Sequence, residues 1–431
     1  MPTVAFVTLG CKVNQYDTQV MREVLKKAGY DLVNPDETAD VYVINTCTVT
    51  SMSDRKSRQM IRRLNSLNPY AVMVVTGCYA ERSPDEIKSI QNVNLVLSNK
   101  DKPFIDKFLN NLTNENQNET NSYPCITTFD DQTRALLKIE DGCDSMCTYC
   151  IVPHVRGCTI HSRPIDSILK EVRSLAENGY KEIVLTGIHL GAYGKDFSDG
   201  IKLPNVLKAI HSVDGIERIR LSSIEPMDVS NELIDEISHL PKCAHHLHIS
   251  LQSGSDRTLH LMRRGYTSLE FENLVNRIRS AIPDVGISTD VMVGFPGETD
   301  QDFAETFDLI SRIKFSKLHV FRYSPREGTP ASKFPDRVPD RISSKRSGKI
   351  IALGEHLLRE FYSSMLEQYT DVLIEGAREG KDNLLAGFTS NYARVLVTDA
   401  NDDLINNIVR VKLIKLEGGY LVGMISPNDH F

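Results

Sequence analysis

Three cysteines lie within eight residues in the first half of the chain, at Cys143, Cys147 and Cys150. Spacing this tight lets one loop wrap a metal centre. Three thiolates leave one iron of a cubane [4Fe–4S] cluster without a protein ligand, and a small molecule can bind and react there. A zinc site that takes His154 or Cys158 as its fourth ligand is the alternative interpretation.

A second set of cysteines is spread over the first part of the chain. Cys11, Cys47 and Cys78 each follow a predicted strand by one to two residues. Because parallel strands end side by side at one edge of a sheet, we expect these thiols to meet there. Gly10 and Gly77 allow close backbone approach to a bulky cluster, and the helices that follow direct their positive ends toward the thiolates. Three independent buried cysteines are the alternative.

The remaining composition narrows the class of protein. Nine cysteines are an odd number in a chain of 431 residues, which argues against a disulfide framework. Cys125, Cys158 and Cys243 are interpreted as plain thiols. The net charge of −7 excludes a polycation that coats nucleic acid. Without a signal peptide or an apolar run of roughly 18 residues, a cytoplasmic protein with no membrane segment is expected.

The first hundred residues alternate apolar runs with amphipathic stretches. This alternation predicts an open α/β domain with a parallel sheet. The expected strands are 3–9, 41–45, 71–76 and 94–97, and the expected helices are 15–28, 50–67 and 84–90. Residues 110–122 contain only one large apolar side chain, Leu112, which indicates a surface linker. The predicted domain covers residues 1–112 and the linker 113–132.

A second alternating block is predicted to form a domain over residues 133–365. Its expected strands are 134–140, 182–186, 218–222, 247–251, 285–293 and 317–323, and its expected helices are 165–178, 206–213, 231–239, 269–281 and 300–313. This pattern predicts a partial (β/α)6 barrel, open on one side. A proline-rich stretch at 325–339 precedes one long helix at 341–368.

The tail, residues 366–431, changes to short alternating runs. Strands are expected at 371–374, 384–388, 393–398, 408–414 and 420–425, with Gly, Asn or Asp at the turns. Five short strands suit a small β-barrel of the oligonucleotide-binding (OB) type. The tail carries six Lys or Arg against ten Asp or Glu, which is a poor balance for gripping RNA broadly.

The first triplet has the pattern C-x₃-C-x-Φ-C, with Tyr149 at Φ, and it opens a predicted partial barrel. In this respect the chain resembles the radical S-adenosylmethionine (SAM) superfamily. The two triplets together resemble the radical SAM methylthiotransferases, whose tail is a small RNA-binding barrel called TRAM, and the likeness covers essentially the whole chain. This resemblance implies SAM and two [4Fe–4S] clusters. Their ligands would be Cys143, Cys147 and Cys150 for one, and Cys11, Cys47 and Cys78 for the auxiliary one.

The resemblance also implies the chemistry. The open iron chelates the amino and carboxylate groups of SAM, and one electron breaks the sulfonium bond to give methionine and a 5′-deoxyadenosyl radical. A second SAM donates a methyl group to sulfur held at the auxiliary cluster. The outcome is replacement of the adenine C2 hydrogen by a methylthio group, with no acid–base side chain as catalyst.

Four stretches resemble one branch of this family, which acts on N6-threonylcarbamoyladenosine at position 37 of tRNA. They are 8–14 (TLGCKVN), 45–50 (NTCTVT), 149–153 (YCIVP) and 185–191 (LTGIHLG). The implied partners are the tRNA anticodon stem-loop, an electron donor and a sulfur source. Isopentenyladenosine tRNA and a ribosomal-protein aspartate are alternative acceptors, and a non-catalytic iron–sulfur sensor that binds RNA is the alternative of another class.

The predicted barrel strands end in small and polar residues, at the rim where a barrel binds its ligand. By resemblance these ends surround SAM, with Thr186 and Gly187 at its amino group. The full set of cofactor candidates is Tyr149, Thr186, Gly187, Ser223, Glu225, Gln252, Asp290, Val293 and Gly294. Polar residues at strand ends also cap helices and form turns, which is the alternative for each.

Basic residues in two helical stretches are candidates for RNA phosphate contacts, and Arg263 and Arg264 are candidates for the carboxylate of the modified nucleoside or for phosphates. They are Arg55, Lys56, Arg58, Arg62, Arg263, Arg264, Arg341 and Lys345. The alternative for each stretch is a solvated helix face. Four histidines, His245, His246, His248 and His319, are interpreted as ordinary strand and surface residues.

Overall fold

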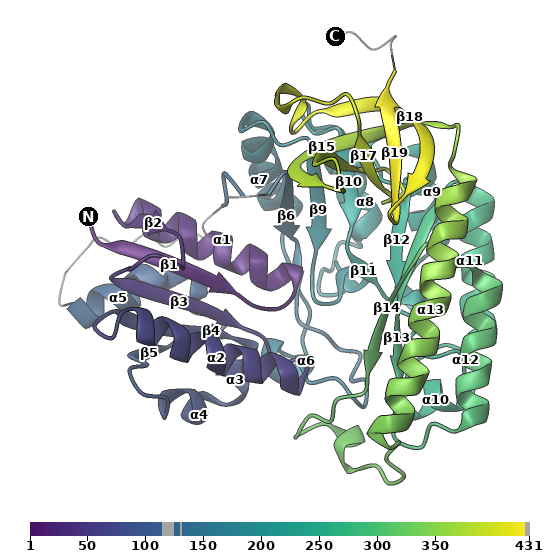
Figure 1. Ribbon diagram of the computed structural model, residues 1–431. Helices are drawn as coiled ribbons and strands as arrows, with labels where there is room; N and C mark the ends of the chain where they lie inside the picture. The colour runs from purple at the N-terminus through teal and green to yellow at the C-terminus, as the bar shows by residue number, and fades with distance from the viewer. Residues whose placement is uncertain (114–124, 130–131, 427–431) are drawn as a thin grey trace.

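A computed structural model describes residues 1–113, 125–129 and 132–426 of the chain. Its first part is a parallel sheet in the order β2-β1-β3-β4-β5 (Figure 1). The strands are β1 (Thr3–Thr8), β2 (Asp31–Val33), β3 (Val41–Thr46), β4 (Val72–Gly77) and β5 (Leu95–Val96). The helices are α1 (Lys12–Lys27), α2 (Ser51–Leu67), α3 (Cys78–Arg82), α4 (Pro84–Lys88) and α5 (Ile105–Thr113), with a 3-10 turn at Lys102–Phe104.

Alternate residues of these strands pack on opposite faces of the sheet. Tyr42 and Ile44 of β3 belong to a core that includes Ile61 of α2, whereas Val41 and Val43 belong to a core that includes Leu25 of α1. The period of two along a strand produces this division. The open α/β architecture expected for this part is confirmed. Strand β2 and helix α3 were not predicted, because each is too short to show a period.

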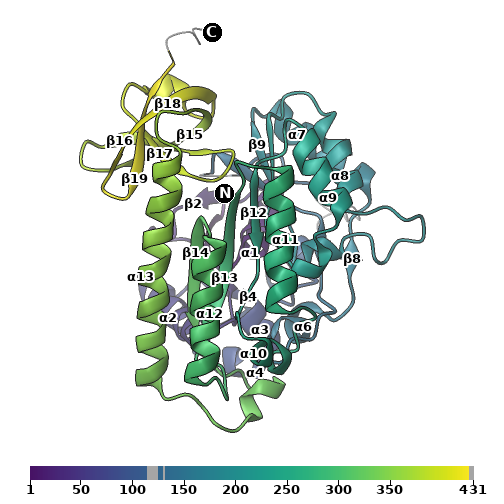
Figure 2. The ribbon, with the colours of Figure 1, turned by 90° about the vertical axis from the view of Figure 1, so that its right-hand side faces the viewer.

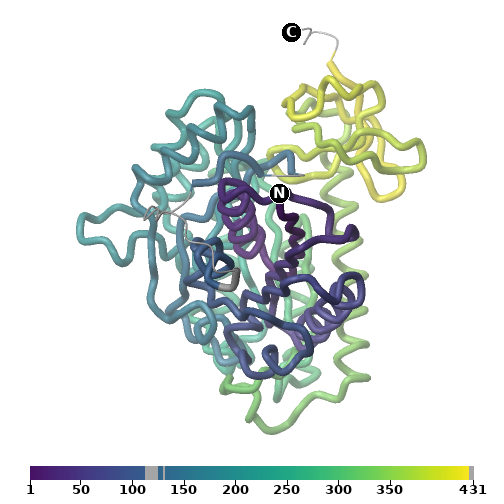
Figure 3. The backbone as a smooth tube through the Cα atoms, turned by 90° about the vertical axis from the view of Figure 1, so that its left-hand side faces the viewer, coloured from purple at the N-terminus to yellow at the C-terminus, as the bar shows by residue number. Residues whose placement is uncertain are grey.

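The second part is a parallel partial barrel. Its strands are β6 (Arg134–Lys138), β9 (Glu182–Thr186), β10 (Arg218–Leu221), β11 (Ser223–Ile224), β12 (His246–Ile249), β13 (Gly286–Val293) and β14 (Lys317–Arg322). They form the sheets β10-β9-β6 and β11-β12-β13-β14, which a bridge between Ile219 and Cys243 joins. The barrel is open between β6 and β14, and the first domain lies against this opening (Figure 3).

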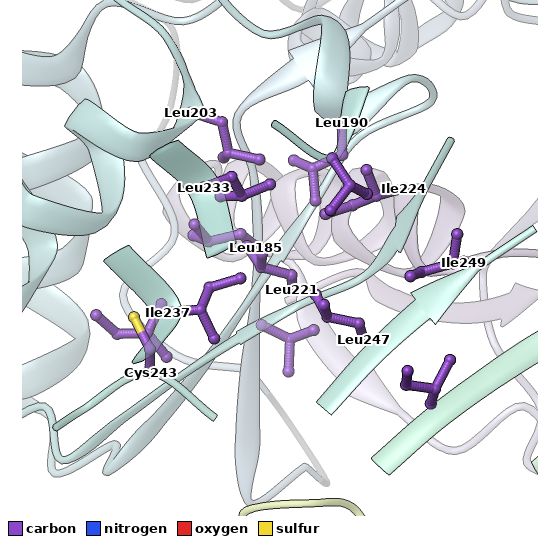
Figure 4. Packing of buried hydrophobic residues seen from close by; sticks show 14 of the residues in the cluster. Leu185, Leu190, Leu203, Leu221, Ile224, Leu233, Ile237, Cys243, Leu247 and Ile249 are labelled. Atoms are coloured by element: carbon purple, nitrogen blue, oxygen red, sulfur yellow. The ribbon is translucent and has the colours of Figure 1, made fainter. Parts of the chain in front are cut away.

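Helices cover the outside of the barrel (Figure 2). They are α7 (Ile165–Glu177), α8 (Leu203–His211), α9 (Asn231–His239), α10 (Asp256–Leu261), α11 (Ser268–Ala281) and α12 (Asp300–Ile313). Figure 4 shows Leu185 and Leu221 of the sheet beside Leu233 and Ile237 of α9. A short hairpin of β7 (Glu140–Asp141) with β8 (His161–Ser162) and a helix α6 (Val152–Arg156) frame the loop that carries the cysteine motif.

The long helix α13 (Asp340–Ser364) runs beside β14 and leads into a closed barrel (Figure 1). Its strands are β15 (Tyr369–Glu379), β16 (Leu384–Thr389), β17 (Arg394–Val397), β18 (Ile408–Glu417) and β19 (Tyr420–Ile425), in the order β15-β16-β17-β19-β18. Arg218 and Arg220 of β10 donate hydrogen bonds to backbone carbonyls of this barrel, at Phe388 and Ser390. The small barrel therefore lies at the N-terminal ends of the central strands.

The linker differs from the expectation where the structure describes it. Residues 110–113 continue helix α5, and most of the expected linker, 114–124 and 130–131, lies outside the described residues. Ile126 and Phe129 are buried in the core of the central barrel, and Thr127 donates to Glu23 of α1. The end of the linker is thus part of the packed interior, because these two apolar side chains find room there. Among the described helices, none has the length and apolarity to cross a bilayer.

Candidate active site

The cysteines Cys11, Cys47 and Cys78 lie at one edge of the first sheet. Cys11 is the N-cap of α1 after β1, Cys47 follows β3 directly, and Cys78 begins α3 after β4. The loops are so close that a Cβ on Gly10 would lie 2.9 Å from Cβ of Cys47. A Cβ on Gly77 would lie 2.4 Å from the carbonyl oxygen of Thr46. Glycine at both positions therefore lets the three cysteine loops pack closely together.

Buried side chains tie the three cysteine loops together. Asn14 donates from Nδ2 to the carbonyls of Leu9 and Thr46, at 2.8 and 3.0 Å. Asn45 donates back to the carbonyl of Asn14 at 2.8 Å, and the hydroxyl of Thr46 donates to the carbonyl of Thr76 at 2.6 Å. These bonds connect the ends of β1, β3 and β4 in sequence. Asn14, Asn45 and Thr46 lie inside the quoted motifs, but their positioning role was not predicted.

The cysteines Cys143, Cys147 and Cys150 share one loop between β7 and α6. The backbone closes on itself through Cys150 N donating to Cys147 O at 3.0 Å, and Met146 takes a left-handed φ of 48°. Burial raises the pKa of Cys147, and it raises the pKa of Cys150 to about 12. These thiols are protonated unless a metal binds them, because a coordinating metal deprotonates a thiol outright.

Two charged side chains flank this loop. Arg264 lies 3.3 Å from Sγ of Cys147 through Nη1, and it forms an ion pair with Glu225. Nδ1 of His189 lies 3.9 Å from Sγ of Cys143, while its Nε2 lies 2.6 Å from Asp228. Burial lowers the pKa of His189, but the hydrogen bonds with Asp228 and Cys143 raise it to about 10 overall. Two cations thus face the thiol sites and suit thiolate charge.

The donor chemistry of both triplets fits an iron–sulfur cluster. In the described part of the chain, no three His, Cys, Asp or Glu side chains are close enough to bind one metal ion. This applies to the two cysteine triplets as well, whose thiols are not arranged around a single ion such as zinc. A cluster of several iron and sulfide atoms needs thiols that are spaced around it, and the assignment of such a cluster to each triplet stays a prediction.

The two triplets belong to one packed unit. Cys78 packs against Ile151 and Val155, which follow Cys150. Arg156, at the end of α6, donates to Oδ1 of Asn14 at 2.5 Å. The helix that follows one triplet is thereby attached to the loop that carries the other.

A buried carboxylate stabilises this junction. Asp17 of α1 accepts hydrogen bonds from Lys102 at 2.9 Å, from Lys138 at 2.7 Å and from Arg156 at 2.9 Å. Burial raises the pKa of Asp17, but the three cations lower it well below its usual range. Lys138 and Arg156 belong to the central barrel, so one ionised carboxylate joins two domains.

The cofactor candidates lie at the C-terminal ends of the barrel strands. Thr186 ends β9, and a Cβ on the next residue, Gly187, would lie 2.5 Å from Oε2 of Glu140. That carboxylate accepts a hydrogen bond from the backbone N–H of His189 at 2.7 Å. Burial raises the pKa of Glu140 to about 8. Glu140 shapes this loop and was not among the predicted site residues.

The remaining candidates lie at the same rim. Gln252 has a left-handed φ of 63° and exchanges backbone hydrogen bonds with Asp290 and Met292. Val293 ends β13, and the backbone N–H of Gly294 donates to Glu298 at 3.0 Å. Tyr149 packs edge-on against Phe295, Ser223 lies in β11, and Glu225 pairs with Arg264. Their roles toward SAM stay predictions.

A cavity of about 360 Å³ lies inside the barrel. Its lining comes from all three domains. Lys12 and Gln15 come from α1, Tyr392 comes from the small barrel, and the central barrel supplies Gln132, Arg134, Leu136, Val184, Arg220, Leu221, Ser223, His246, His248, Ser288, Asp290, Lys317, His319 and Phe321. Lys12 follows Cys11 directly, so the cavity begins beside the auxiliary triplet. Polar and cationic side chains dominate this wall.

The RNA candidates divide into exposed and engaged residues. Arg55, Lys56 and Arg62 are exposed on α2. Arg263 is exposed in the turn after α10, and Arg341 and Lys345 are exposed on α13. Arg58 donates to the hydroxyl of Tyr79 and pairs with Glu86. The assignment of Arg264 to RNA is wrong, because this side chain is buried and bound to Glu225 and Cys147. The three remaining cysteines, Cys125, Cys158 and Cys243, form no disulfide.

The partial barrel and its cysteine loop define a radical SAM protein. The model of the Radical SAM superfamily matches residues 137–310, and that of the uncharacterized protein family UPF0004 matches residues 3–98. Among solved structures, the radical SAM methyltransferase TsrM from Kitasatospora setae has a TM-score of 0.56 at 15% identity, over 77% of each chain. This likeness shows the fold alone.

Two curated relatives carry the same name, threonylcarbamoyladenosine tRNA methylthiotransferase MtaB. The protein of Bacillus subtilis (strain 168) is 42% identical over 96% of this chain and 94% of its own. The protein of Thermotoga maritima is 43% identical over 82% of each chain. A tRNA-2-methylthio-N(6)-dimethylallyladenosine synthase of Acetivibrio thermocellus is 32% identical over 97% of this chain and 90% of its own. The chain belongs to the radical SAM methylthiotransferase family, and it uses SAM and iron–sulfur chemistry.

Proposed function

We propose that the protein is a tRNA methylthiotransferase that converts N6-threonylcarbamoyladenosine at position 37 to its 2-methylthio derivative. The carrying observation is the polar, cationic cavity that begins beside the auxiliary triplet. An isopentenyl group is apolar and would leave these polar walls without partners, which is costly when they are buried. A threonylcarbamoyl group carries a carboxylate and a hydroxyl that can satisfy them. The most similar relatives named above carry the same activity in their names.

Two cluster sites with different tasks complete the proposal. Cys143, Cys147 and Cys150 would hold the cluster that binds SAM, and Cys11, Cys47 and Cys78 would hold an auxiliary [4Fe–4S] cluster. The first cluster would supply the electron that forms the radical from SAM, and the auxiliary cluster would hold the sulfur for transfer. The chain itself supplies position, because the Asp17 junction joins the domain that carries one triplet to the barrel that carries the other. Proximity is needed because the adenine C2–H bond is too unreactive for acid–base chemistry.

The anticodon stem-loop would approach the cavity where the three domains that line it meet. A modified adenosine in a single-stranded loop can be splayed out and enter the cavity. The exposed basic side chains Arg55, Lys56 and Arg62 would contact phosphates, and Arg341 and Lys345 would do so along α13. Such an enzyme works in the cytoplasm, where its tRNA substrate resides, and it depends on a separate electron donor and sulfur source.

The proposal is tested with two stem-loops that differ only in the N6 group at position 37. The enzyme is reconstituted without oxygen and incubated with SAM, a strong reductant and either RNA. Mass spectrometry should find methylthiolation of the threonylcarbamoyl RNA alone. Product on the isopentenyl RNA alone would contradict the acceptor, and absence of 5′-deoxyadenosine with both would favour the sensor.

A further inference from the structure

Two lysines from different domains line the cavity without a partner. Lys12 comes from the first turn of α1, and Lys317 begins β14. The described residues provide neither ammonium group with a hydrogen bond or an ion pair. An ammonium group in a partly enclosed site gains from an anion, because the attraction there is stronger than in bulk water.

The neighbouring arginines already have carboxylate partners. Arg220 pairs with Glu182 at 2.7 Å, and Arg134 pairs with Glu375 at 3.0 Å. Both also hold Tyr392 in place: the Arg220 guanidinium lies 4.6 Å from its ring centroid, and Arg134 donates to its hydroxyl at 3.1 Å. Fixed partners keep these arginines at the wall. Lys12 and Lys317 are the cations left for a ligand.

The pKa shifts of three titratable groups indicate a positive electrostatic potential in this cavity. Burial raises the pKa of Tyr392, but Arg134, Lys12 and Arg220 lower it overall. Burial lowers the pKa of His246 and of His319, and nearby cations lower both further. Among the described lining residues Asp290 is the one carboxylate, and it lies 3.3 Å from Nε2 of His248. The cavity therefore favours an added negative charge.

We infer that Lys12 and Lys317 form the subsite that binds the carboxylate of the substrate's threonyl group. This inference rests on the proposed function. A backbone phosphate remains outside the barrel, whereas the carboxylate enters with the splayed base. Because Lys12 belongs to the first domain and Lys317 to the barrel, the carboxylate bridges the two domains. Its position beside Lys12, and thus beside Cys11, aligns the nucleoside with the auxiliary site.

The test removes the negative charge of the threonyl carboxylate and the positive charge of each lysine, one at a time. One stem-loop carries threonylcarbamoyladenosine, and a second carries the threoninamide analogue, which is neutral and nearly isosteric. Binding to the reconstituted enzyme is measured by fluorescence anisotropy. Lys12→Met and Lys317→Met should each weaken binding of the carboxylate RNA by about tenfold to a hundredfold. Binding of the amide RNA should change less than about twofold.

Controls separate this role from others. Lys26→Met alters an exposed lysine near the end of the same helix and should not affect either RNA. Lys12→Arg should restore most of the preference for the carboxylate. If Lys12→Met loses iron, Lys317→Met tests the subsite by itself, because Lys317 is remote in sequence from every cysteine of the triplets. Equal loss for both RNAs, or no loss, overturns the subsite. Failure of the unaltered enzyme to methylthiolate the carboxylate RNA overturns the proposed function instead.

Discussion

Arg156 binds Asn14 across the interface between the first domain and the barrel, with Nη2 2.5 Å from Oδ1. Arg156 ends the helix that follows Cys150, and Asn14 ties together the loops of Cys11 and Cys47. One side-chain contact therefore relates the two thiol sites. A radical centre and a sulfur source must lie close together for transfer, and this contact helps to fix their separation.

The two triplets should lose different functions when they are altered. Cys147→Ala should abolish reductive cleavage of SAM, because it removes a ligand of the SAM-binding cluster. Cys47→Ala should retain cleavage but form no methylthio product. Each variant should contain roughly half of the iron of the unaltered protein. Chromatography of 5′-deoxyadenosine and of the product nucleoside measures both steps. Equal loss of cleavage in two folded variants would contradict the division.

Asn14→Ala should loosen the auxiliary triplet of Cys11, Cys47 and Cys78. It removes one donor shared by two carbonyls and one acceptor of Arg156, and buried groups lose their partners. The free energy of unfolding should fall by about 2 to 4 kcal/mol in urea titrations followed by circular dichroism. Gln59→Ala, on the exposed side of α2, is the control and should change stability by less than about 0.5 kcal/mol. Comparable losses in the free energy of unfolding of Asn14→Ala and of the control would contradict the positioning role of Asn14.

Asp17→Asn should destabilise the domain junction by about 3 to 5 kcal/mol. Among the described residues, buried Lys102 loses its one counter-charge, and Lys138 and Arg156 keep only Asp141. The pKa of Asp17 is lowered in the folded state, so its contribution is complete above the unfolded pKa of about 3.9 and is lost as the pH falls below it. The difference in the free energy of unfolding between the unaltered protein and Asp17→Asn should stay constant from about pH 6 to about pH 8. A difference that disappears across that range would contradict the assignment.

Gly77→Ala tests how closely the cysteine loops pack. Gly77 has φ 93° and ψ −173°, a region reserved for glycine, and its Cβ would strike Thr46. We expect a loss of about 3 kcal/mol or more in the free energy of unfolding. Gly29 also has a positive φ, at 88°, but open space around it, so Gly29→Ala should cost about 1 to 2 kcal/mol. Equal costs would show that only backbone strain matters.

Much of the fold follows from local pattern. Helices α9 and α12 and strand β19 have the predicted bounds, because each has a clear period and an N-cap or turn residue at its start. Strand β11 has two residues and carries no period, so it was missed. Ile126 and Phe129 were assigned to a linker because their burial depends on a barrel core formed by distant residues.

The candidate site was predictable to the extent that topology determines it. Parallel strands bring Cys11, Cys47 and Cys78 to one edge, and that edge follows from the strand pattern alone. Arg264 was assigned to RNA because its charge was visible but its partner Glu225 was not. Lys12 was passed over for the same reason, since only the assembled domains show that it faces a cavity shared with Lys317.

The most direct test of the central claim is the nucleoside composition of tRNA from a strain that lacks this gene. Liquid chromatography with mass spectrometry should show that 2-methylthio-N6-threonylcarbamoyladenosine disappears and that its unmethylthiolated precursor accumulates. The intact gene should restore the product, and a Cys147→Ala copy should not. Unchanged levels of the methylthiolated nucleoside in the deletion strain would contradict the account.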